Sequence, residues 1–261
     1  MDVPLFPLQT VLSPGLVIPL HVFEPRYRLL TERCLDERSP FGVVLIREGR
    51  EVGEAATRLA RVGTLAEIRQ AGRFPDGRYA LLVEGTRRFT VDRVDAEREP
   101  YLVGEVTLLP EAVGDEARSR EAARRVLDRF LEYVVIYQTL AAGRGQAEQR
   151  EAEAGSATGP GGAGDPGAAG VDGNPGGLDW HEDVVRSIRR LSSPDDPVTV
   201  SHLVGGLLQV DLGDRQALLE EPTAEARLAR LEALLDRELQ LLGRGLPPYR
   251  VDRRSSLHRL N

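Results

Sequence analysis

The side chains that most often carry out catalysis are missing or poorly spaced in this sequence. All 34 basic residues are arginine, so no lysine is present to form a Schiff base, to hold a nucleotide phosphate or to complete a Ser–Lys dyad. The single cysteine, Cys34, excludes an internal disulfide and a cysteine-rich metal site. The four histidines lack the spacing of metal ligands: His21, His181, His202 and His258. We therefore expect a protein that is not an enzyme and that uses no cofactor or metal.

A second group of polar residues surrounds Gly85, in the stretch VEGTRR that begins at Val83. Glu84, Arg87 and Arg88 could hydrogen-bond the backbone of a bound peptide. They could equally form a solvated turn, with a weak surface ion pair worth about 0–1 kcal/mol. A different alternative is RNA binding, and the net charge of −7 argues against it. That alternative would use four arginines: Arg87, Arg88, Arg93 and Arg98.

The composition is that of a soluble protein with a core, since 41% of the 261 residues are hydrophobic. The apolar start, MDVPLFPLQTVLSPGLVIPL, is interrupted by four prolines and has no basic region, so it predicts neither a signal peptide nor a membrane span. No other apolar run reaches about 18 residues. We expect a cytoplasmic protein that does not bind membranes.

Residues 1–112 predict a β-rich domain that would position the residues around Gly85. Leu16–Ile18 and Phe41–Ile46 are short apolar runs, as buried strands would be. Asp76-Gly77 lies between two alternating runs and predicts a hairpin with a type I′ turn, and Gly85 then predicts a bulge or corner. One amphipathic helix, EPRYRLLTERCLDERS, would pack on the sheet, with Pro25 in its first turn and Cys34 in the core. Many short strands with one helix predict a small closed or half-closed barrel.

The rest of the chain predicts helices interrupted by a linker. Residues 113–142 read as one long helix, and residues 143–178 hold 12 of the 27 glycines and read as a flexible linker. Residues 179–243 predict a helical bundle, and residues 244–261 a basic, mobile tail. Within the bundle we expect helices over Trp180–Leu191, Val198–Val210 and Arg215–Glu220, and a last helix that begins after an N-cap at Thr223.

These stretches also resemble the N-terminal domain of Lon proteases. The start, FPLQTVLSPGLVIPLHVFEPRYRLL, has the Pro-Leu, Pro-Gly and Ile-Pro-Leu punctuation of that domain. ARVGTLAEIRQAGRFPDGRYALLVEGTRRFTVDRV resembles its Val-Gly-Thr strand, Pro-Asp-Gly turn and Val-Glu-Gly corner, and SHLVGGLLQVDLGDRQALLEEPTAEARLARLEALLDREL resembles its helical part. The likeness extends over about Val3 to Leu242, without the glycine-rich segment. No single motif is diagnostic, and their order and spacing together carry the resemblance.

The resemblance implies an α+β fold, with a PUA-like β pseudo-barrel that has one packed helix and is followed by an α-helical bundle. In the family this region captures protein substrates, supports oligomer assembly and contains no catalytic residue. The chain has no G-x-x-x-x-G-K-[ST] motif and no lysine for the peptidase dyad of Lon. The resemblance thus implies a non-catalytic module that binds exposed hydrophobic segments of client proteins. The alternative is an adaptor or assembly partner for a separate protease, which would dock or self-associate through the helices.

The residues expected to bind a peptide come from the first helix, the first strands and the Gly85 corner. The apolar members could line a groove or could instead form the barrel core, and His21 could be a site residue or a partly buried, satisfied histidine. We expect the loops near Pro14 and Pro19 to lie at the surface, where proline stiffens the backbone. The full candidate set is Phe6, Pro14, Ile18, His21, Phe23, Tyr27, Glu84, Arg87 and Arg88.

Overall fold

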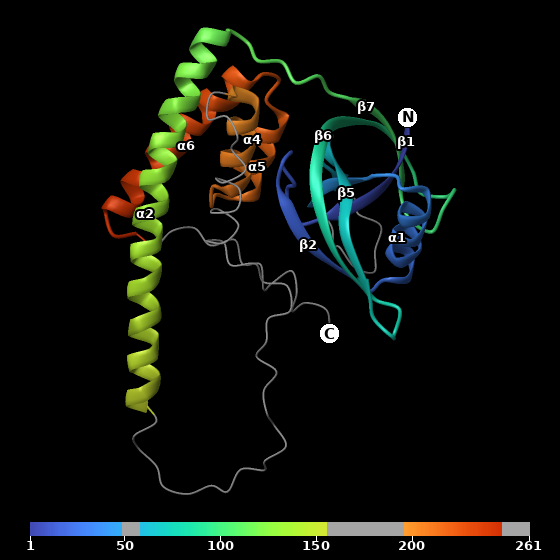
Figure 1. Cartoon of the computed structure of the whole chain (residues 1–261), viewed down its shortest axis with the longest axis horizontal. Helices are drawn as coiled ribbons and strands as arrows, with labels where there is room; N and C mark the ends of the chain where they lie inside the picture. Colours follow the sequence, from blue (N-terminus) through green and yellow to red (C-terminus); the bar gives the residue numbers. More distant parts are fainter. Residues whose placement is uncertain (49–57, 156–195, 247–261) are drawn as a thin grey trace, which may run out of the picture.

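The computed structural model describes residues 1–48, 58–155 and 196–246, which form a β-barrel and a block of helices beside it (Figure 1). The strands are β1 (Asp2–Leu8), β2 (Val17–Val22), β3 (Phe41–Glu48), β4 (Arg58–Leu59), β5 (Val62–Arg73), β6 (Tyr79–Asp95) and β7 (Val103–Leu108). The helices are α1 (Pro25–Glu37), α2 (Glu116–Gly155), α4 (Pro197–Leu207), α5 (Leu212–Glu220) and α6 (Ala224–Gly243). Strands followed by helices confirm the α+β fold class.

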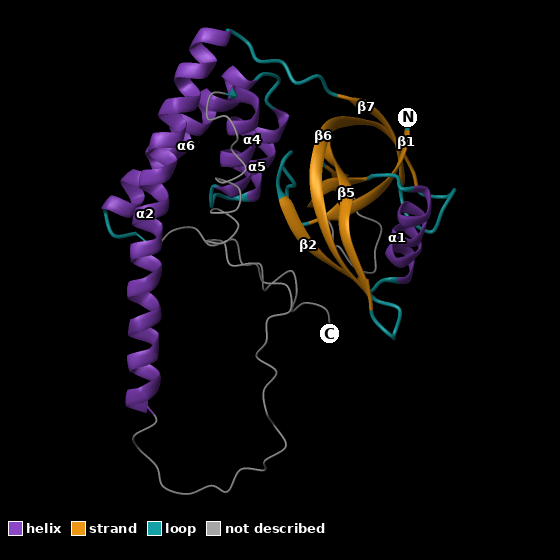
Figure 2. Cartoon of the chain, in the orientation of Figure 1, coloured by secondary structure: helices purple, strands orange, loops and turns teal. Residues whose placement is uncertain are grey.

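Five strands close into a ring, in the order β1-β7-β6-β5-β3 and back to β1 (Figure 2). The β1–β3 pair is parallel, and the other pairs of the ring are antiparallel. The long strand β6 pairs with β5 along most of its length, with β2 through its first half and with β7 through its second half. The expected small barrel is therefore closed, and β2 is an additional strand on its side.

The inside of the ring is filled by a few large side chains. Phe89 and Leu5 are completely buried there, together with Val3, Val44, Leu65 and Val106. Glycines on neighbouring strands make room for these two side chains, because a Cβ on Gly42 or Gly63 would lie 2.7 Å from the Phe89 ring. Gly63 belongs to the Val-Gly-Thr stretch, so the barrel interior gives that motif a packing reason.

The hairpin between β5 and β6 lies where the sequence predicts it, but its turn is of another type. Gly77 has a φ of +84°, whereas Asp76 does not have a positive φ. The Gly77 N–H donates to the Phe74 carbonyl and the Phe74 N–H donates to the Arg78 carbonyl, as in a three-residue loop with a glycine bulge. Type I′ was the wrong prediction because Pro75 fixes a negative φ at the first loop position.

The α2 and α6 helices run parallel and form the centre of the helical block. Three ion pairs join the helices, and the residue numbers increase in the same direction on both: Arg118–Glu225, Arg125–Glu232 and Arg129–Asp236. Buried residues recur at alternating spacings of three and four on each helix, as in a coiled-coil seam. They are Ser119, Ala123, Val126, Phe130 and Tyr133 on α2, and Ala224, Leu228, Leu231, Leu235, Glu238 and Leu242 on α6. Thr223 caps α6 as expected, since its side chain accepts from the Ala226 N–H at 3.1 Å.

Helix α2 continues farther than the sequence predicted. It runs to Gly155, past the end of α6 (Figure 1), whereas we expected a linker from residue 143 onward. Gly143 and Gly145 suggested a loop, but the alanines, glutamines and glutamates that follow are strong helix formers. The rest of that linker, the expected Trp180–Leu191 helix and tail residues 247–261 lie outside the described residues. No helix in the described ranges is both long enough and apolar enough to cross a membrane.

The barrel and the helical block share one hydrophobic core. A single cluster of buried residues includes Leu12 and Leu16 from the barrel and Leu203 and Leu207 from α4. The α4 backbone lies directly against side chains of the loop before β2 here, because a Cβ on Gly206 would lie 2.2 Å from Leu16 Cδ1. The expected boundary at residues 112 and 113 falls in the loop between β7 and α2, and the independence of the two parts as domains stays a prediction.

Candidate functional site

The side of the barrel formed by β2, β6 and β5 has one accessible face, which we call the outer face. In the β2–β6 register, Val17, Pro19 and His21 lie opposite Glu84, Leu82 and Ala80. Paired residues share a side of the sheet, and the alternate residues Val22, Leu81 and Val83 are buried. The outer face therefore consists of Val17, Pro19, His21, Ala80, Leu82 and Glu84, which are all exposed or partly exposed.

Two aromatic rings lie at the hairpin end of the outer face. The His21 and Phe74 rings meet edge to face, with centroids 5.8 Å apart. The Arg78 guanidinium lies 5.5 Å from the Phe74 centroid and forms an ion pair with Asp76 at 2.6 Å. Phe74 remains 41% exposed. Such a supported but accessible ring is suited to contact an apolar side chain of a ligand.

The opposite end of the outer face is charged. Glu84 is partly buried, and its Oε2 accepts from Arg69 Nε at 2.7 Å. Arg69 also pairs with Glu67 at 3.0 Å. Because Arg69 is about half exposed, solvent screens this pair and it contributes little to stability. Glu84 thus matches the surface-pair interpretation, and it borders the outer face.

Most apolar candidates of the sequence analysis belong to the core rather than to a groove. Phe6 and Tyr27 are buried and stack on each other with centroids 4.2 Å apart, and Phe41 lies beside Phe6. Pro14 is also buried, in the loop before β2 that faces α4. Residue type could not separate these two roles, because the same apolar side chains serve in a core and in a binding groove.

The remaining candidates are spread over accessible positions. Ile18 is partly buried and packs on the core from β2, and Phe23 is partly buried just before α1. His21 is exposed on the outer face and Arg87 is exposed on β6. The structure therefore brings His21 and Glu84 onto one face, places Ile18 in the same strand pair, and separates Arg87 from them by the Gly85 corner.

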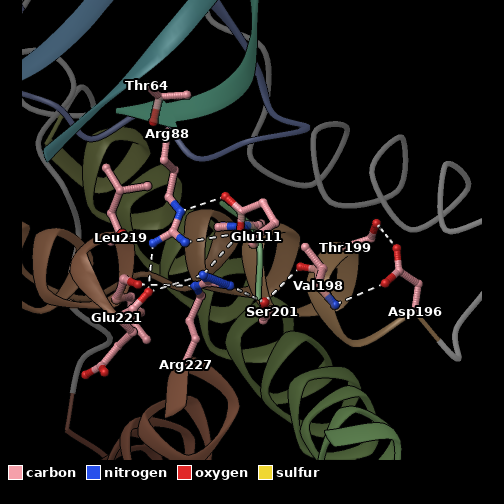
Figure 3. A network of polar contacts seen from close by, with 12 residues as sticks. Thr64, Arg88, Glu111, Asp196, Val198, Thr199, Ser201, Leu219, Glu221 and Arg227 are labelled. Atoms are coloured by element: carbon pink, nitrogen blue, oxygen red, sulfur yellow. Dashed lines mark hydrogen bonds and ion pairs between the residues drawn. The ribbon is translucent and has the colours of Figure 1, made fainter. Parts of the chain in front are cut away.

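Arg88 contradicts both interpretations that the sequence left open for it. Its side chain is only 1% exposed, so it belongs neither to a peptide site nor to a solvated turn. Its Nε and Nη2 donate to the two carboxylate oxygens of Glu111 at 2.8 and 3.1 Å. Its Nη1 donates to the carbonyls of Leu219 and Glu221, at 2.6 and 2.7 Å (Figure 3). Arg88 therefore joins the barrel to the end of α5.

Glu111 is the centre of a buried charged junction that also includes Arg227 and His202. Arg227, from α6, is 1% exposed and lies 3.5 Å from Glu111 Oε2, and its Nη1 donates to Ser201 Oγ at 2.8 Å. His202 Nε2, from α4, lies 3.0 Å from the same Glu111 oxygen. Because a carboxylate only accepts, the neutral His202 ring donates from Nε2. We call Arg88, Glu111, His202 and Arg227 the charged junction.

The junction shifts the pKa values of its members. Burial alone would raise the pKa of Glu111, but hydrogen bonds from His202 and Arg88 and their charges hold it at about 2. Burial lowers the pKa of His202 to about 4, although the hydrogen bond to Glu111 opposes the change. Burial and the neighbouring Arg88 charge lower the pKa of Arg227 to about 10. At neutral pH the junction thus holds two guanidinium cations, one carboxylate and a neutral imidazole.

Sequence reasoning did not identify Glu111, His202 and Arg227 as members of a site. They come from a loop and two helices far from Arg88 in the chain, and no local spacing links them. The available signal was the position of His202 and Arg227 on the buried sides of their helices. Because buried polar and charged groups need partners, these positions indicate that a compensating group lies nearby.

The arginines of the RNA-binding alternative do not form one patch. Arg88 is buried, and Arg98 forms an ion pair with Asp2 at 2.6 Å. Arg87 and Arg93 are exposed on β6. Within the described ranges, no group of three or more His, Cys, Asp or Glu side chains could hold a metal ion.

Comparison with known sequences agrees with the resemblance to the N-terminal domain of Lon proteases. The family model described as the ATP-dependent protease La (LON) substrate-binding domain matches residues 2–237. The Lon protease of Xanthomonas oryzae is 35% identical over 136 residues, which cover 51% of this chain and 16% of that protein. The Lon protease of Escherichia coli K12 is 23% identical over 243 residues, which cover 93% of this chain and 25% of that protein. The chain spans a quarter or less of the length of these relatives.

Two solved structures are similar over most of the chain. The Lon N-terminal domain protein from Xanthomonas campestris has a TM-score of 0.52 at 24% identity and covers 89% of this chain and 98% of its own. The N-terminal domain of Mycobacterium avium complex Lon protease has a TM-score of 0.52 at 20% identity, with 90% and 98% covered. At this identity the comparison concerns the fold, and it confirms a barrel followed by helices.

Proposed function

The chain belongs to the family of ATP-dependent protease La (LON) substrate-binding domains, and from this we propose that it is a non-catalytic module that binds exposed hydrophobic segments of client polypeptides. The observation that carries the proposal is the outer face, where Pro19, Leu82 and Phe74 leave apolar surface accessible beside polar groups at both ends. A client segment would lie across β2 and β6 and place an apolar side chain against Phe74.

The affinity of such a site is modest. The outer face is shallow, and an unfolded client loses conformational freedom when it binds. Affinity would be concentrated in the few contacts around the aromatic pair, as in other interfaces where a small number of residues dominate. The Phe74 ring already contacts Arg78 and His21, so it loses little further conformational freedom when a client binds.

Titration of a labelled, permanently unfolded protein tests the proposal by fluorescence anisotropy. Phe74→Ala should weaken binding at least about fivefold, because it removes the most accessible ring of the outer face. Val94→Ala is the matched control, since Val94 is 40% exposed on the other end of β6 and should change the affinity less than about twofold. No saturation at several hundred micromolar with diverse unfolded clients would refute the proposal, as would equal effects of both substitutions.

The adaptor alternative stays a prediction from the resemblance. It requires that the helical block dock onto a separate protease or onto another copy of the chain. Retention of a protease from lysate by the immobilised full chain, lost on competition with excess free chain, would support it.

A further inference from the structure

The charged junction connects the barrel, the loop before α2 and the helices α4 and α6 at one point. Arg88 comes from β6 in the barrel, Glu111 from the loop between β7 and α2, His202 from α4 and Arg227 from α6. Arg88 and Arg227 both also donate to the carbonyl of Glu221, just after α5 (Figure 3). A change at Glu111 therefore acts directly on the barrel, α4 and α6, and acts through the two arginines on the end of α5.

Glu111 provides the negative charge that compensates two buried cations. Among the described residues, it is the carboxylate that lies within 4.0 Å of both Arg88 and Arg227. The Glu221 carboxylate also attracts Arg227, but it forms its own ion pair with Arg230 at 3.3 Å. A buried guanidinium without a compensating charge is strongly unfavourable, and neutral Glu111 would leave Arg88 and Arg227 facing each other.

Outside the junction, polar contacts between the two parts include a surface ion pair, Arg47–Glu220, and a hydrogen bond from Gln216 to the Val62 carbonyl. Apolar contacts also join the two parts, through the shared core around Leu16 and Leu203 and through the cluster of Val62 and Leu219. These contacts do not involve the charge of Glu111. Glu111 is also reachable from water, since its side chain is 30% exposed, whereas its partners are buried. The charge of Glu111 can thus change without prior unfolding of either part.

We propose that the charged junction is a latch between the barrel and the helical block, and that loss of the Glu111 charge opens this junction while both parts keep their secondary structure. The proposal concerns the relative placement of the two parts and does not depend on client binding. It identifies Glu111 as the residue that fixes one orientation of the barrel on the helices.

The direction of the pH effect follows from the groups that face Glu111. His202 has a folded pKa of about 4, below its ordinary value of 6.5, so its contribution to the closed state is complete above about pH 6.5 and is lost as the pH falls toward 4. Glu111 has a folded pKa of about 2, below 4.5, so its contribution is lost at still lower pH. Arg88 and Arg227 stay charged throughout, and protonation of either group adds positive charge beside them. Acid therefore opens the latch.

Distance measurements between two spin labels test the latch. Labels at Ala96→Cys in the barrel and Ala233→Cys on α6 would report the placement of the two parts, and the buried Cys34 would stay unlabelled. At pH 7.5 the otherwise unsubstituted chain should give one distance, with the open form below about 10% of molecules. In the E111Q chain a longer distance should become the major population, with an unchanged far-UV circular dichroism spectrum. E105Q, at an exposed glutamate on β7, is the matched control and should keep the single distance.

Acid titration of the chain without the Glu111 substitution gives a second test that does not depend on the folding of a variant. The longer distance should begin to appear below about pH 6.5, where His202 gains a proton in the open form, and should become the major population below about pH 4.5, where Glu111 gains one, before the circular dichroism signal is lost. An unchanged distance in E111Q would overturn the proposal. The proposal would also be overturned if secondary structure were lost whenever the distance changed, because the two parts would then unfold together and not separate.

Discussion

At the scale of single residues, Arg87 and Arg88 are neighbours in sequence but lie in opposite environments. The β5–β6 register shifts between Ala66, which pairs with Gly85, and Thr64, which pairs with Arg88. This bulge inserts one additional residue into β6, so simple alternation across Gly85 assigns the wrong faces to the residues that follow. A glycine in a strand indicates a possible β-bulge, but the local sequence does not reveal how many additional residues the bulge contains.

Substitution of these two arginines should give very different losses of stability. Arg88→Met removes one partner of a buried ion pair and leaves Glu111 without its bidentate donor, so we expect a loss of about 3–5 kcal/mol in the free energy of unfolding. Arg87→Met, at the exposed neighbour, should change it by less than about 0.5 kcal/mol. Urea unfolding followed by circular dichroism measures both. Similar values for the two variants would contradict the buried placement of Arg88.

At the scale of elements, the sequence predicted helix starts well where a local signal marks them, whereas α5 begins at Leu212 rather than Arg215 and α4 ends at Leu207 rather than Val210. Pro25 begins α1 and Thr223 caps α6, because these signals depend on the first turn alone. The end of α2 was predicted too early, because glycines lower helix propensity without determining where a helix stops. The heptad seam of α2 and α6 was visible as apolar spacing on each helix, but their parallel pairing depends on contacts between distant parts of the chain.

The two adjacent glycines of α4 provide a prediction about element packing. A Cβ at Gly206 would lie 2.2 Å from Leu16 Cδ1 and 3.0 Å from Ser13 Cβ, so Gly206→Ala should destabilise the protein by about 1–3 kcal/mol. At Gly205 the nearest atom is Leu218 Cδ1 at 3.5 Å, which is ordinary contact. Gly205→Ala should therefore stabilise by up to about 1 kcal/mol through helix propensity. Urea midpoints of the two variants measure the difference, and equal midpoints would show that the barrel does not press on α4.

At the scale of the whole molecule, the barrel could be predicted more fully than the site. Alternating strands, a hairpin and a glycine corner are local signals, and together they predicted a small barrel that the pairing of β1 with β3 closes. The candidate site required knowledge of which apolar residues face outward. Phe6 and Tyr27 turned inward and Phe74 remained accessible, and neither outcome follows from residue type. The charged junction was beyond local reasoning because its four members meet only after the helices pack on the barrel.

The charge of the whole molecule separates the proposed function from RNA binding. The net charge is −7, Arg88 is buried and Arg98 is paired, so the four candidate arginines of the barrel offer an RNA strand no continuous basic surface. Binding of an unfolded client to the apolar outer face should therefore change less than about twofold in Kd between 50 and 200 mM salt, whereas RNA binding through several phosphates would weaken steeply over that range.

Anisotropy titrations at three salt concentrations, with an unfolded client and with a single-stranded RNA of mixed sequence, measure both dependences. The double variant Arg87→Gln and Arg93→Gln is the control, because it removes the two exposed arginines of β6 without touching the outer face. It should leave client affinity unchanged. A salt-dependent RNA complex that this variant abolishes would contradict the client-binding proposal and support Arg87 and Arg93 on β6 as a nucleic-acid contact, since phosphate contacts alone produce that combination of results.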